Sequence, residues 1–178
     1  MLYSTLYSSP AGVITLECDD EGNALTGLWI EGQRKPGDEP EDCERRDDIR
    51  LFISVKQWLD SYFNRENPSV RDIPLSPRGN EFRRTVWDVL RKIPYGTVTT
   101  YGAVAREVAA LLHKDKMSAQ AVGGAVGSNP VSIIIPCHRV IGANGRLTGY
   151  AGGQDKKIIL LRTEGIDCRG DMVYTYTQ

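Results

Sequence analysis

The amino-acid sequence predicts an α/β protein in two parts: a small antiparallel sheet with one helix, then a mostly helical domain containing a helix-turn-helix. Three observations predict this division. Short apolar runs alternate with turn residues at the start, later apolar residues recur at helical spacing, and a proline-rich stretch separates the two patterns. That stretch covers residues 67–79, so we expect domains at residues 1–78 and 79–178.

The first half begins with strands. We expect them at residues 2–7, 13–18 and 25–30, separated by short segments rich in turn-forming residues. Such short connections predict an antiparallel meander. Residues 32–46, with their prolines and charges, are predicted to form a loop, and the helical spacing that follows predicts a helix from Asp47 to about Phe63.

In the second half, capping residues precede the first three predicted helices. The second and third helices are joined by a short polar connector and resemble a helix-turn-helix unit. The four expected helices cover residues 81–91, 100–112, 119–128 and 154–163, with Asn80, Thr99 or Thr100, and Ser118 as the caps of the first three.

The third of these helices has an unusual outward face. Its predicted outward residues are Gln120, Ala121, Gly124, Ala125 and Gly127, whereas a helix that reads bases usually presents longer polar side chains. Glycine weakens a helix by about 1 kcal/mol relative to alanine, so the glycines need a reason. Either the backbone approaches a narrow surface such as a DNA minor groove, or the helix packs tightly on another helix. Neither alternative predicts sequence-specific base reading.

The chain has a net charge of −1, but its basic and acidic residues are unevenly distributed between the two halves. Residues 1–78 contain 9 basic and 15 acidic residues. Residues 79–178 contain 13 basic and 8 acidic residues. An anionic partner is therefore expected at the second half, although solvated surface charge alone gives the same pattern.

The number and spacing of the cysteines and histidines argue against a disulfide-bonded or zinc-binding protein. The four cysteines are scattered, which predicts free thiols in a reducing compartment, and the two histidines make a zinc site unpromising. With no apolar run long enough for a membrane span and no export leader, we expect a cytoplasmic protein with no membrane partner. No metal and no cofactor are expected.

Cys137 and His138 follow an apolar run and Pro136. A free cysteine is only about 3% thiolate at neutral pH, and an adjacent histidine is one way to activate it. An inert core cysteine would give the same pattern. Neighbouring side chains in an extended chain also point to opposite sides, so contact between the two would need a turn or a bridging water. Tyr101 and Tyr150 are candidate phenolic donors.

Five strings resemble one family, the O6-alkylguanine-DNA alkyltransferases, also called methylated-DNA–protein-cysteine methyltransferases. The likeness is strong from about residue 80 to residue 165 and only general before it. The strings are PYGTVTTYGAVA (94–105), VGGAVGSNP (122–130), IPCHRVIG (135–142), TGYAGG (148–153) and LRTEG (161–165).

This resemblance implies a single-use DNA repair enzyme. It would irreversibly transfer a methyl or other alkyl group from O6 of guanine to a cysteine after flipping the base, with O4 of thymine as a second potential target. The implied catalytic set is Cys137 as nucleophile, His138 acting through a water, Glu164 orienting the imidazole, Asn129 bracing the loop and Tyr101 donating to the departing guanine. The implied set for substrate and DNA is Gln120, Ala121, Gly124, Arg139, Val140, Tyr150 and Ala151.

The implied partner is double-stranded DNA with an alkylated guanine, bound in the minor groove without sequence preference by a monomer. Two positions depart from the family pattern. Gln120 stands where many members have an arginine that fills the gap left by the flipped base, and Ala151 where some have serine. A lesion-binding module that does not react, and a cysteine hydrolase with multiple turnovers, remain as alternatives.

Overall fold

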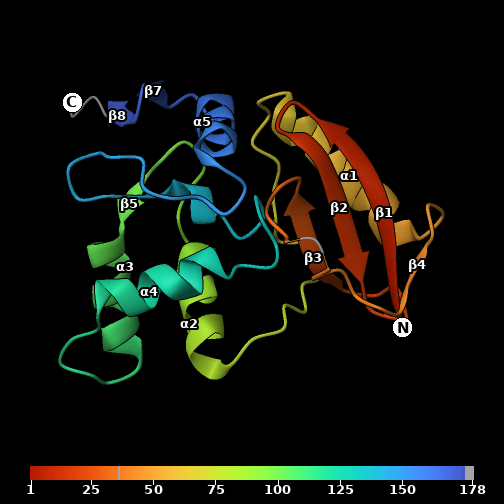
Figure 1. Ribbon diagram of the computed structural model, residues 1–178, viewed down its shortest axis with the longest axis horizontal. Coiled ribbons are helices and arrows are strands. Elements are labelled where there is room, and N and C mark those ends of the chain that lie inside the picture. The colour runs from red at the N-terminus through yellow and green to blue at the C-terminus, as the bar shows by residue number, and fades with distance from the viewer. Residues whose placement is uncertain (36, 175–178) are drawn as a thin grey trace.

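The computed structural model describes residues 1–35 and 37–174, so Pro36 of the predicted loop and the last four residues lie outside the described part. Figure 1 shows a sheet half, with the N-terminus at its outer end, beside a half made mostly of helices. No helix within the described ranges is both long and apolar enough to cross a membrane.

The sheet has the strand order β3-β2-β1-β4. β1 (Leu2–Ser9), β2 (Gly12–Cys18) and β3 (Leu25–Ile30) pair antiparallel, which confirms the predicted meander. β4 (Cys43–Arg45) pairs parallel with β1, so the sheet is mixed and part of the predicted loop is a strand. Three residues are too few to show alternation, and it is the free edge of β1 that makes them a strand.

One helix, α1 (Arg50–Phe63), lies along the sheet and buries Phe52, Val55, Leu59 and Tyr62 (Figure 1). It starts later than the predicted Asp47. The carboxylate of Asp47 instead accepts a hydrogen bond from the Thr5 hydroxyl on β1, so this residue ties the helix entrance to the sheet.

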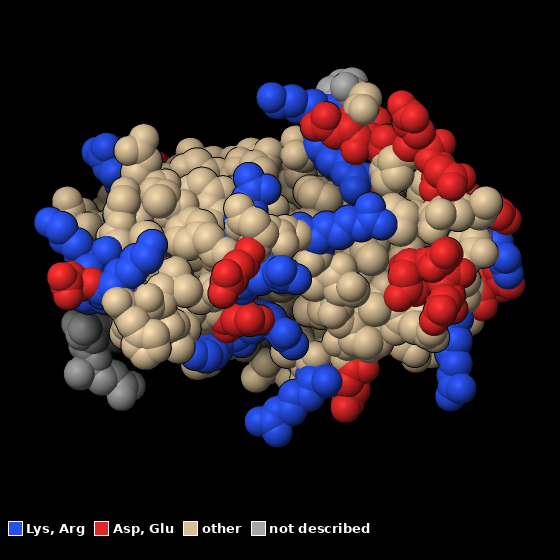
Figure 2. Space-filling model, turned by 90° about the horizontal axis from the view of Figure 1, so that it is seen from below, with Lys and Arg blue, Asp and Glu red and all other residues tan. Residues whose placement is uncertain are grey.

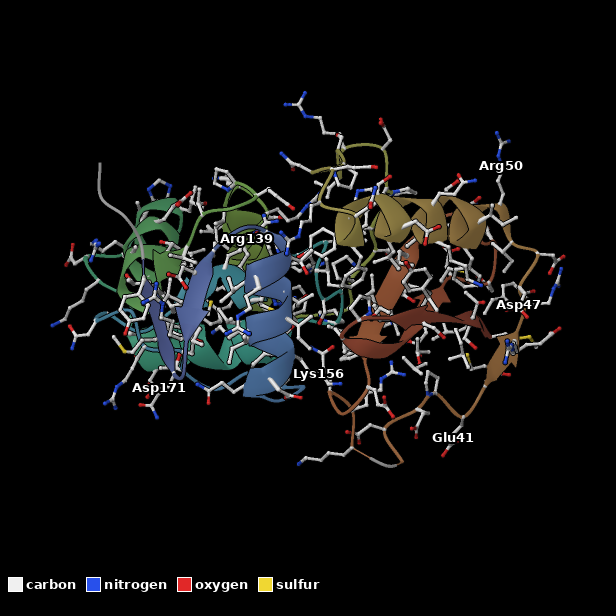
Figure 3. All side chains as sticks on the ribbon, turned by 90° about the horizontal axis from the view of Figure 1, so that it is seen from above. Glu41, Asp47, Arg50, Arg139, Lys156 and Asp171 are labelled. Carbon is white, nitrogen blue, oxygen red and sulfur yellow. The ribbon has the colours of Figure 1, made fainter. Side chains whose placement is uncertain are left out.

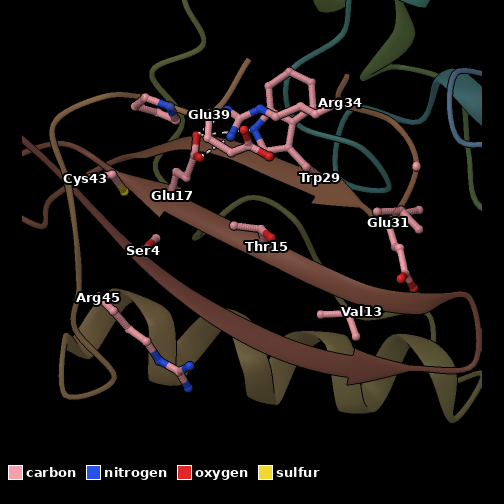
Figure 4. A pocket seen from close by; sticks show the side chains of 13 residues that line it. Ser4, Val13, Thr15, Glu17, Trp29, Glu31, Arg34, Glu39, Cys43 and Arg45 are labelled. Atoms are coloured by element: carbon pink, nitrogen blue, oxygen red, sulfur yellow. Dashed lines mark hydrogen bonds and ion pairs between the residues drawn. The ribbon is translucent and has the colours of Figure 1, made fainter. Parts of the chain in front are cut away.

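The other side of the sheet is open and carries a groove of about 610 Å³ (Figure 4). Its buried acid, Glu17, accepts hydrogen bonds from Trp29 and from both terminal nitrogens of Arg34. The Arg34 guanidinium also stacks 4.2 Å from the centroid of the Trp29 ring. These contacts fasten the segment after β3 to the sheet and fix the position of the neighbouring Gln33.

The helices of the second half begin at the predicted caps. Asn80 accepts a hydrogen bond from the backbone of Arg83, Thr100 from Ala103, and Ser118 from Ala121, so of the two threonines Thr100 is the cap. The elements are α2 (Glu81–Leu90), α3 (Tyr101–Leu111), α4 (Ala119–Gly127) and α5 (Gln154–Thr163). α3, its connector and α4 form the expected helix-turn-helix.

The spacing of apolar residues did not predict the four short strands in the described part of this half, although the family resemblance of residues 94–105 implied a strand there. β5 (Thr99–Thr100) pairs parallel with β6 (Val140–Ile141), and β7 (Asp167–Arg169) pairs antiparallel with β8 (Met172–Tyr174). Each is too short for the alternation that identifies a strand in sequence. The β5–β6 pair sets the start of α3 beside the residues that follow Cys137.

A continuous hydrophobic core joins the two halves. The buried segment 131–135 runs against β3: Leu28 donates a backbone hydrogen bond to Pro130, and Ser132 donates one to Leu28, both at 2.9 Å. On α4 the prediction for Ala125 was wrong, because this residue is buried and its carbonyl accepts a hydrogen bond from the Trp87 indole of α2 at 2.9 Å.

Candidate active site and DNA-binding helix

The run before Cys137 is buried, and the backbone then turns sharply. Cys137–Arg139 form a single 3₁₀ turn, so Cys137 and His138 do not lie in extended chain. The Arg139 amide donates to the Pro136 carbonyl at 3.0 Å and closes this turn. The turn directs both side chains into the protein interior.

Behind the cysteine, buried donors converge on the carboxylate of Glu164, which follows the last residue of α5. Its Oε1 lies 2.6 Å from His138 Nε2 and accepts a hydrogen bond from the Tyr62 hydroxyl at 2.8 Å. Arg139, near α5 in the middle of the molecule (Figure 3), donates to both carboxylate oxygens, and the Gly96 amide donates to Oε2 at 3.0 Å. The carboxylate is fully enclosed by these partners.

The ionisation of this cluster follows from its contacts. Burial by itself would raise the pKa of Glu164, but the hydrogen bonds from His138 and Arg139 and the positive charge of Arg139 hold it well below its usual range, so Glu164 is an anion. Burial lowers the pKa of His138 and keeps the ring neutral at neutral pH. Because a carboxylate only accepts hydrogen bonds, the ring proton must lie on Nε2.

This assignment leaves Nδ1 of His138 as a free acceptor. The atom is buried and has no hydrogen-bond partner in residues 1–35 and 37–174. A buried acceptor without a partner is costly, and an ordered water is the usual remedy. A neutral imidazole with an available lone pair is also the form that can take a proton.

Cys137 opens onto a small pocket of about 40 Å³, which is enough for a water or a small alkyl group. The pocket lies between α3, α4 and the loop before α5. Its other lining residues are Gln33, Tyr101, Gly123, Val126, Gly127, Asn129, Gly149, Tyr150 and Ala151.

Burial raises the pKa of the Cys137 thiol, whereas the Asn129 amide and the charge of Lys157 act in the opposite direction. Burial also raises the pKa of Cys18, to about 11, and the neighbouring Asp19 adds to the effect. Burial alone therefore does not distinguish Cys137 from the other cysteines. The Asn129 amide and the pocket beside its sulfur do distinguish it.

Asn129 fixes the loop that leads to the cysteine. Its side-chain amide donates to the carbonyl of Ile135 at 2.7 Å, and its oxygen accepts from the amide of Val131 at 2.9 Å. Within this loop Ile133 has φ of 68°, a left-handed conformation that is unfavourable for a β-branched residue. The two side-chain hydrogen bonds of Asn129 help to hold that strained backbone in place.

The structure brings many of the sequence-predicted residues together. Tyr101, Asn129, Tyr150 and Ala151 line the pocket with Cys137, and His138 and Glu164 lie behind it. Gln120, Ala121 and Gly124 are exposed on α4.

Val140 and Arg139 are placed differently from the substrate-contacting positions expected for them. Val140 is buried outside the pocket lining, and its carbonyl accepts a hydrogen bond from Lys157 at 2.6 Å. Arg139 points inward, with Nε and Nη2 bound to Glu164 and Nη1 to the carbonyl of Ile93. Its guanidinium is therefore engaged inside the protein rather than displayed at a DNA-facing surface.

Sequence reasoning missed three residues at the site: Gln33, Tyr62 and Lys157. Lys157 lies three positions before Leu160 on the buried side of α5, a spacing that could have identified it. Tyr62 lies on the apolar face of α1, and this helical spacing by itself indicates a core residue. Gln33, whose side-chain oxygen accepts from the Ser132 hydroxyl at 2.8 Å, gives no local signal, because only tertiary folding brings it to the pocket.

The glycines of α4 are not required by packing inside the protein. A Cβ atom placed on Gly124 or Gly127 would meet nothing within 4 Å among the described residues, and one on Gly123 would touch the Tyr101 ring at an ordinary 3.9 Å. Tight helix–helix packing therefore does not explain Gly124 and Gly127. The small size of both residues leaves open space beside α4, and Gly127 also lines the pocket beside Cys137.

Charged side chains are distributed as the sequence indicated. Figure 2 shows acidic side chains gathered over the sheet half, while basic side chains extend across the middle and over the helical half. Arg106, Lys114 and Lys116 lie on or beside the helix-turn-helix and are exposed. This arrangement suits an anionic partner at the helical half.

Within the described ranges, no three histidine, cysteine or acidic side chains come together as a metal site would require. All four cysteines are free thiols.

Comparisons with known families match both halves. Residues 2–77 match the family described as 6-O-methylguanine DNA methyltransferase, ribonuclease-like domain. Residues 81–166 match the corresponding DNA binding domain.

Curated relatives are similar over nearly the whole chain. A methylated-DNA–protein-cysteine methyltransferase of Methanosarcina acetivorans is 40% identical over 92% of this chain and 99% of its own. A methylated-DNA–protein-cysteine methyltransferase of Haemophilus influenzae is 39% identical over 93% of this chain and 87% of its own. Among solved structures, Mycobacterium tuberculosis OGT in complex with DNA is 36% identical, with a TM-score of 0.77, over 91% of this chain and 92% of that one.

Proposed function

The chain belongs to the 6-O-methylguanine DNA methyltransferase family, and from this premise we propose that Cys137 is the residue that takes the alkyl group. The protein binds DNA and repairs it by transferring an alkyl group from O6 of guanine to one of its own cysteines. One observation carries the choice of Cys137: its thiol lines a pocket beside the helix-turn-helix and is backed by a neutral histidine that is hydrogen-bonded to a buried carboxylate.

In the proposed reaction the sulfur of Cys137 attacks the alkyl carbon while the bond from that carbon to O6 breaks. The thiol proton passes through a water to Nδ1 of His138. The guanine leaves as an anion and takes up one proton from solvent water, and the imidazolium of His138 returns its proton to solvent. Protons and electrons balance, so no co-reactant is needed. Glu164 holds the ring so that Nδ1 faces away from the carboxylate, and Arg139 holds Glu164.

The aromatic residues of the pocket are proposed to contact the departing base and its alkyl group. Burial raises the pKa of Tyr101, so its hydroxyl stays protonated and can donate a hydrogen bond to the guanine ring. Tyr150 and Ala151 would border the alkyl group and the base. An alkyl group on O4 of thymine presents a similar electrophilic carbon, so alkylated thymine is a second candidate substrate.

The target atom lies inside the duplex, so the nucleotide must rotate out, at a cost of a few kcal/mol. We propose that the exposed face of α4 lies in the minor groove, where Gln120 contacts the orphaned partner base. Small residues let the backbone approach closely, and contacts to phosphates carry no sequence information, so binding should ignore base sequence. The protein would act as a monomer, in a reducing compartment such as the cytoplasm that keeps Cys137 free.

The product of the reaction is a thioether, whose carbon is a poor electrophile, so the thiol is not regenerated. This separates alkyl transfer from the two alternatives. A cysteine hydrolase would turn over many times, and a lesion-binding module would not react.

Incubation of the protein with methylated duplex DNA tests this proposal. We expect intact mass to rise by one methyl group per protein, with the modification on the peptide that contains Cys137. The plateau should equal the amount of protein, however much substrate is added. An unchanged mass in the presence of excess methylated duplex, or product exceeding protein, would rule out single-use transfer.

A Gly124→Leu variant tests the proposed DNA-binding face. The added side chain extends into open space, and glycine is a poor helix former, so stability should stay the same or rise by up to about 1 kcal/mol. Affinity for unmodified duplex should fall about tenfold, because overpacking a close contact costs about 1–3 kcal/mol.

Fluorescence anisotropy titration measures that affinity, with Gln57→Leu on the exposed side of α1 as the matched control. The same DNA affinity in both variants would place the interface away from α4.

A further inference from the structure

We propose that Tyr62 of the sheet half is a positioning residue for alkyl transfer: its hydroxyl holds the carboxylate that orients His138. The inference rests on the proposed function of Cys137 and extends it to the other half of the chain. It gives the sheet half a part in the chemistry.

The contact is direct and enclosed. The Tyr62 hydroxyl donates to Glu164 Oε1 at 2.8 Å and lies 3.4 Å from His138 Nε2. Tyr62 is 1% exposed, although it is separated from Glu164 by 102 positions in sequence. The same carboxylate oxygen therefore receives hydrogen bonds from the phenol and from the imidazole.

The ring of Tyr62 is held rigidly. It stacks on Trp58 with centroids 5.4 Å apart and makes edge contacts with Phe63 and Tyr95 at 5.2 and 6.0 Å. A hydroxyl on a fixed ring costs little entropy to place, so its hydrogen bond can restrict where the carboxylate lies. Two of the rings come from α1 itself, so the docking of this helix sets the position of the hydroxyl.

The donor direction is unambiguous. Burial and the negative charge of Glu164 both raise the pKa of Tyr62, so its oxygen keeps its proton and can donate to the carboxylate. With Tyr62, Gly96 and Arg139 as its other donors, Glu164 stays in one orientation. His138 then keeps its proton on Nε2 and leaves Nδ1 available.

Removal of this one hydroxyl should change how the imidazole titrates. The charged groups that act on His138 are Glu164 and Lys157 from the region of α5, and Arg139 from its own turn. With one donor fewer, the carboxylate charge is less compensated and favours a protonated imidazole. In a plot of transfer rate against pH, the acidic limb is the region where the rate falls because the imidazole of His138 becomes protonated. This acidic limb should therefore move to higher pH.

Tyr62→Phe tests the inference because it keeps the ring and removes only the hydroxyl. The first-order transfer rate constant on methylated duplex should fall about tenfold at neutral pH, as expected for the loss of a hydrogen bond to a buried charge. The DNA concentration that gives half the maximal rate should stay unchanged. The acidic limb should move to higher pH, and the imidazole nitrogen NMR signals of His138 should report a higher pKa.

Tyr95→Phe is the matched control. It removes a hydroxyl from a neighbouring ring, but that hydroxyl donates to the carbonyl of Thr163 rather than to Glu164. It should leave the transfer rate, the pH profile and the His138 signals as in the wild type. Thermal unfolding of both variants checks that they are folded at the assay temperature.

The outcomes separate the inference from the function on which it rests. If the wild type takes up no alkyl group, the proposed role of Cys137 fails, while the NMR signals of His138 still test the Tyr62 contact. If the wild type reacts and Tyr62→Phe shows the same rate and the same acidic limb, the inference is wrong. Equal shifts in Tyr62→Phe and Tyr95→Phe would also overturn it.

Discussion

A Cys137→Ser variant is expected to take up no alkyl group from methylated duplex DNA at any ratio of DNA to protein. Serine has nearly the same size, but its hydroxyl is far less acidic than a thiol and a weaker nucleophile toward carbon. Intact mass after prolonged incubation measures the result. Because α4 is untouched, the variant should still bind duplex DNA.

Cys168→Ser is the matched control, since Cys168 is buried to a similar extent but lies outside the pocket. It should take up one methyl group per protein, as the wild type does. Alkylation of the Cys137→Ser variant would assign the reaction to another residue. Retained binding without reaction would match the lesion-binding alternative and show that this single sulfur separates the two activities.

Glu164→Gln is expected to reduce both stability and the transfer rate. Glutamine fits the space, but it leaves the guanidinium of Arg139 buried without its anion. It also replaces one acceptor oxygen by an NH2 donor, so the His138 tautomer is no longer fixed by an acceptor-only group. Breaking a buried ion pair costs about 3–5 kcal/mol. The transfer rate should fall by about two orders of magnitude, the lower range for loss of a general base.

Urea unfolding measures the stability and mass spectrometry over time measures the rate. Glu107→Gln is the control, because its pair with Lys92 is exposed. That variant should lose less than about 1 kcal/mol and keep the wild-type transfer rate. Similar losses in the two variants would mean that the buried carboxylate has no special role.

Lowering the pH should reduce the free energy of unfolding of the wild type, because the buried contacts of Glu164 depend on its negative charge. Despite its burial, Glu164 has a folded-state pKa below its unfolded value, because His138 and Arg139 favour its anion. Its stabilising effect is therefore complete above the unfolded pKa, near 4.3, and is lost as the pH falls below that value. Unfolding experiments between neutral pH and pH ~3 should show a steeper loss for the wild type than for Glu164→Gln.

Much of the local structure could be predicted from sequence, because local chemistry specifies it. Asn80 and Ser118 cap helices through side-chain hydrogen bonds within three residues, and α5 begins and ends where expected. The strings around Cys137 were sufficient to identify the family. The small outward residues on α4 left two explanations open in the sequence, close approach to a narrow surface and tight packing on another helix.

The remaining features depend on contacts between distant segments. β4 is a strand because β1 has a free edge, and Ala125 is buried because Trp87 covers it. Gln33 reaches the pocket because Arg34 and Glu17 fasten its loop to the sheet.

The same division applies to the catalytic group. Cys137, the proposed nucleophile, and His138 are neighbours in sequence, so a motif could reveal them. The donors around Glu164, by contrast, come from segments up to 102 positions apart. Local patterns carry no information about such distant partners, because a buried carboxylate is stabilised only by the donors that the finished fold places around it.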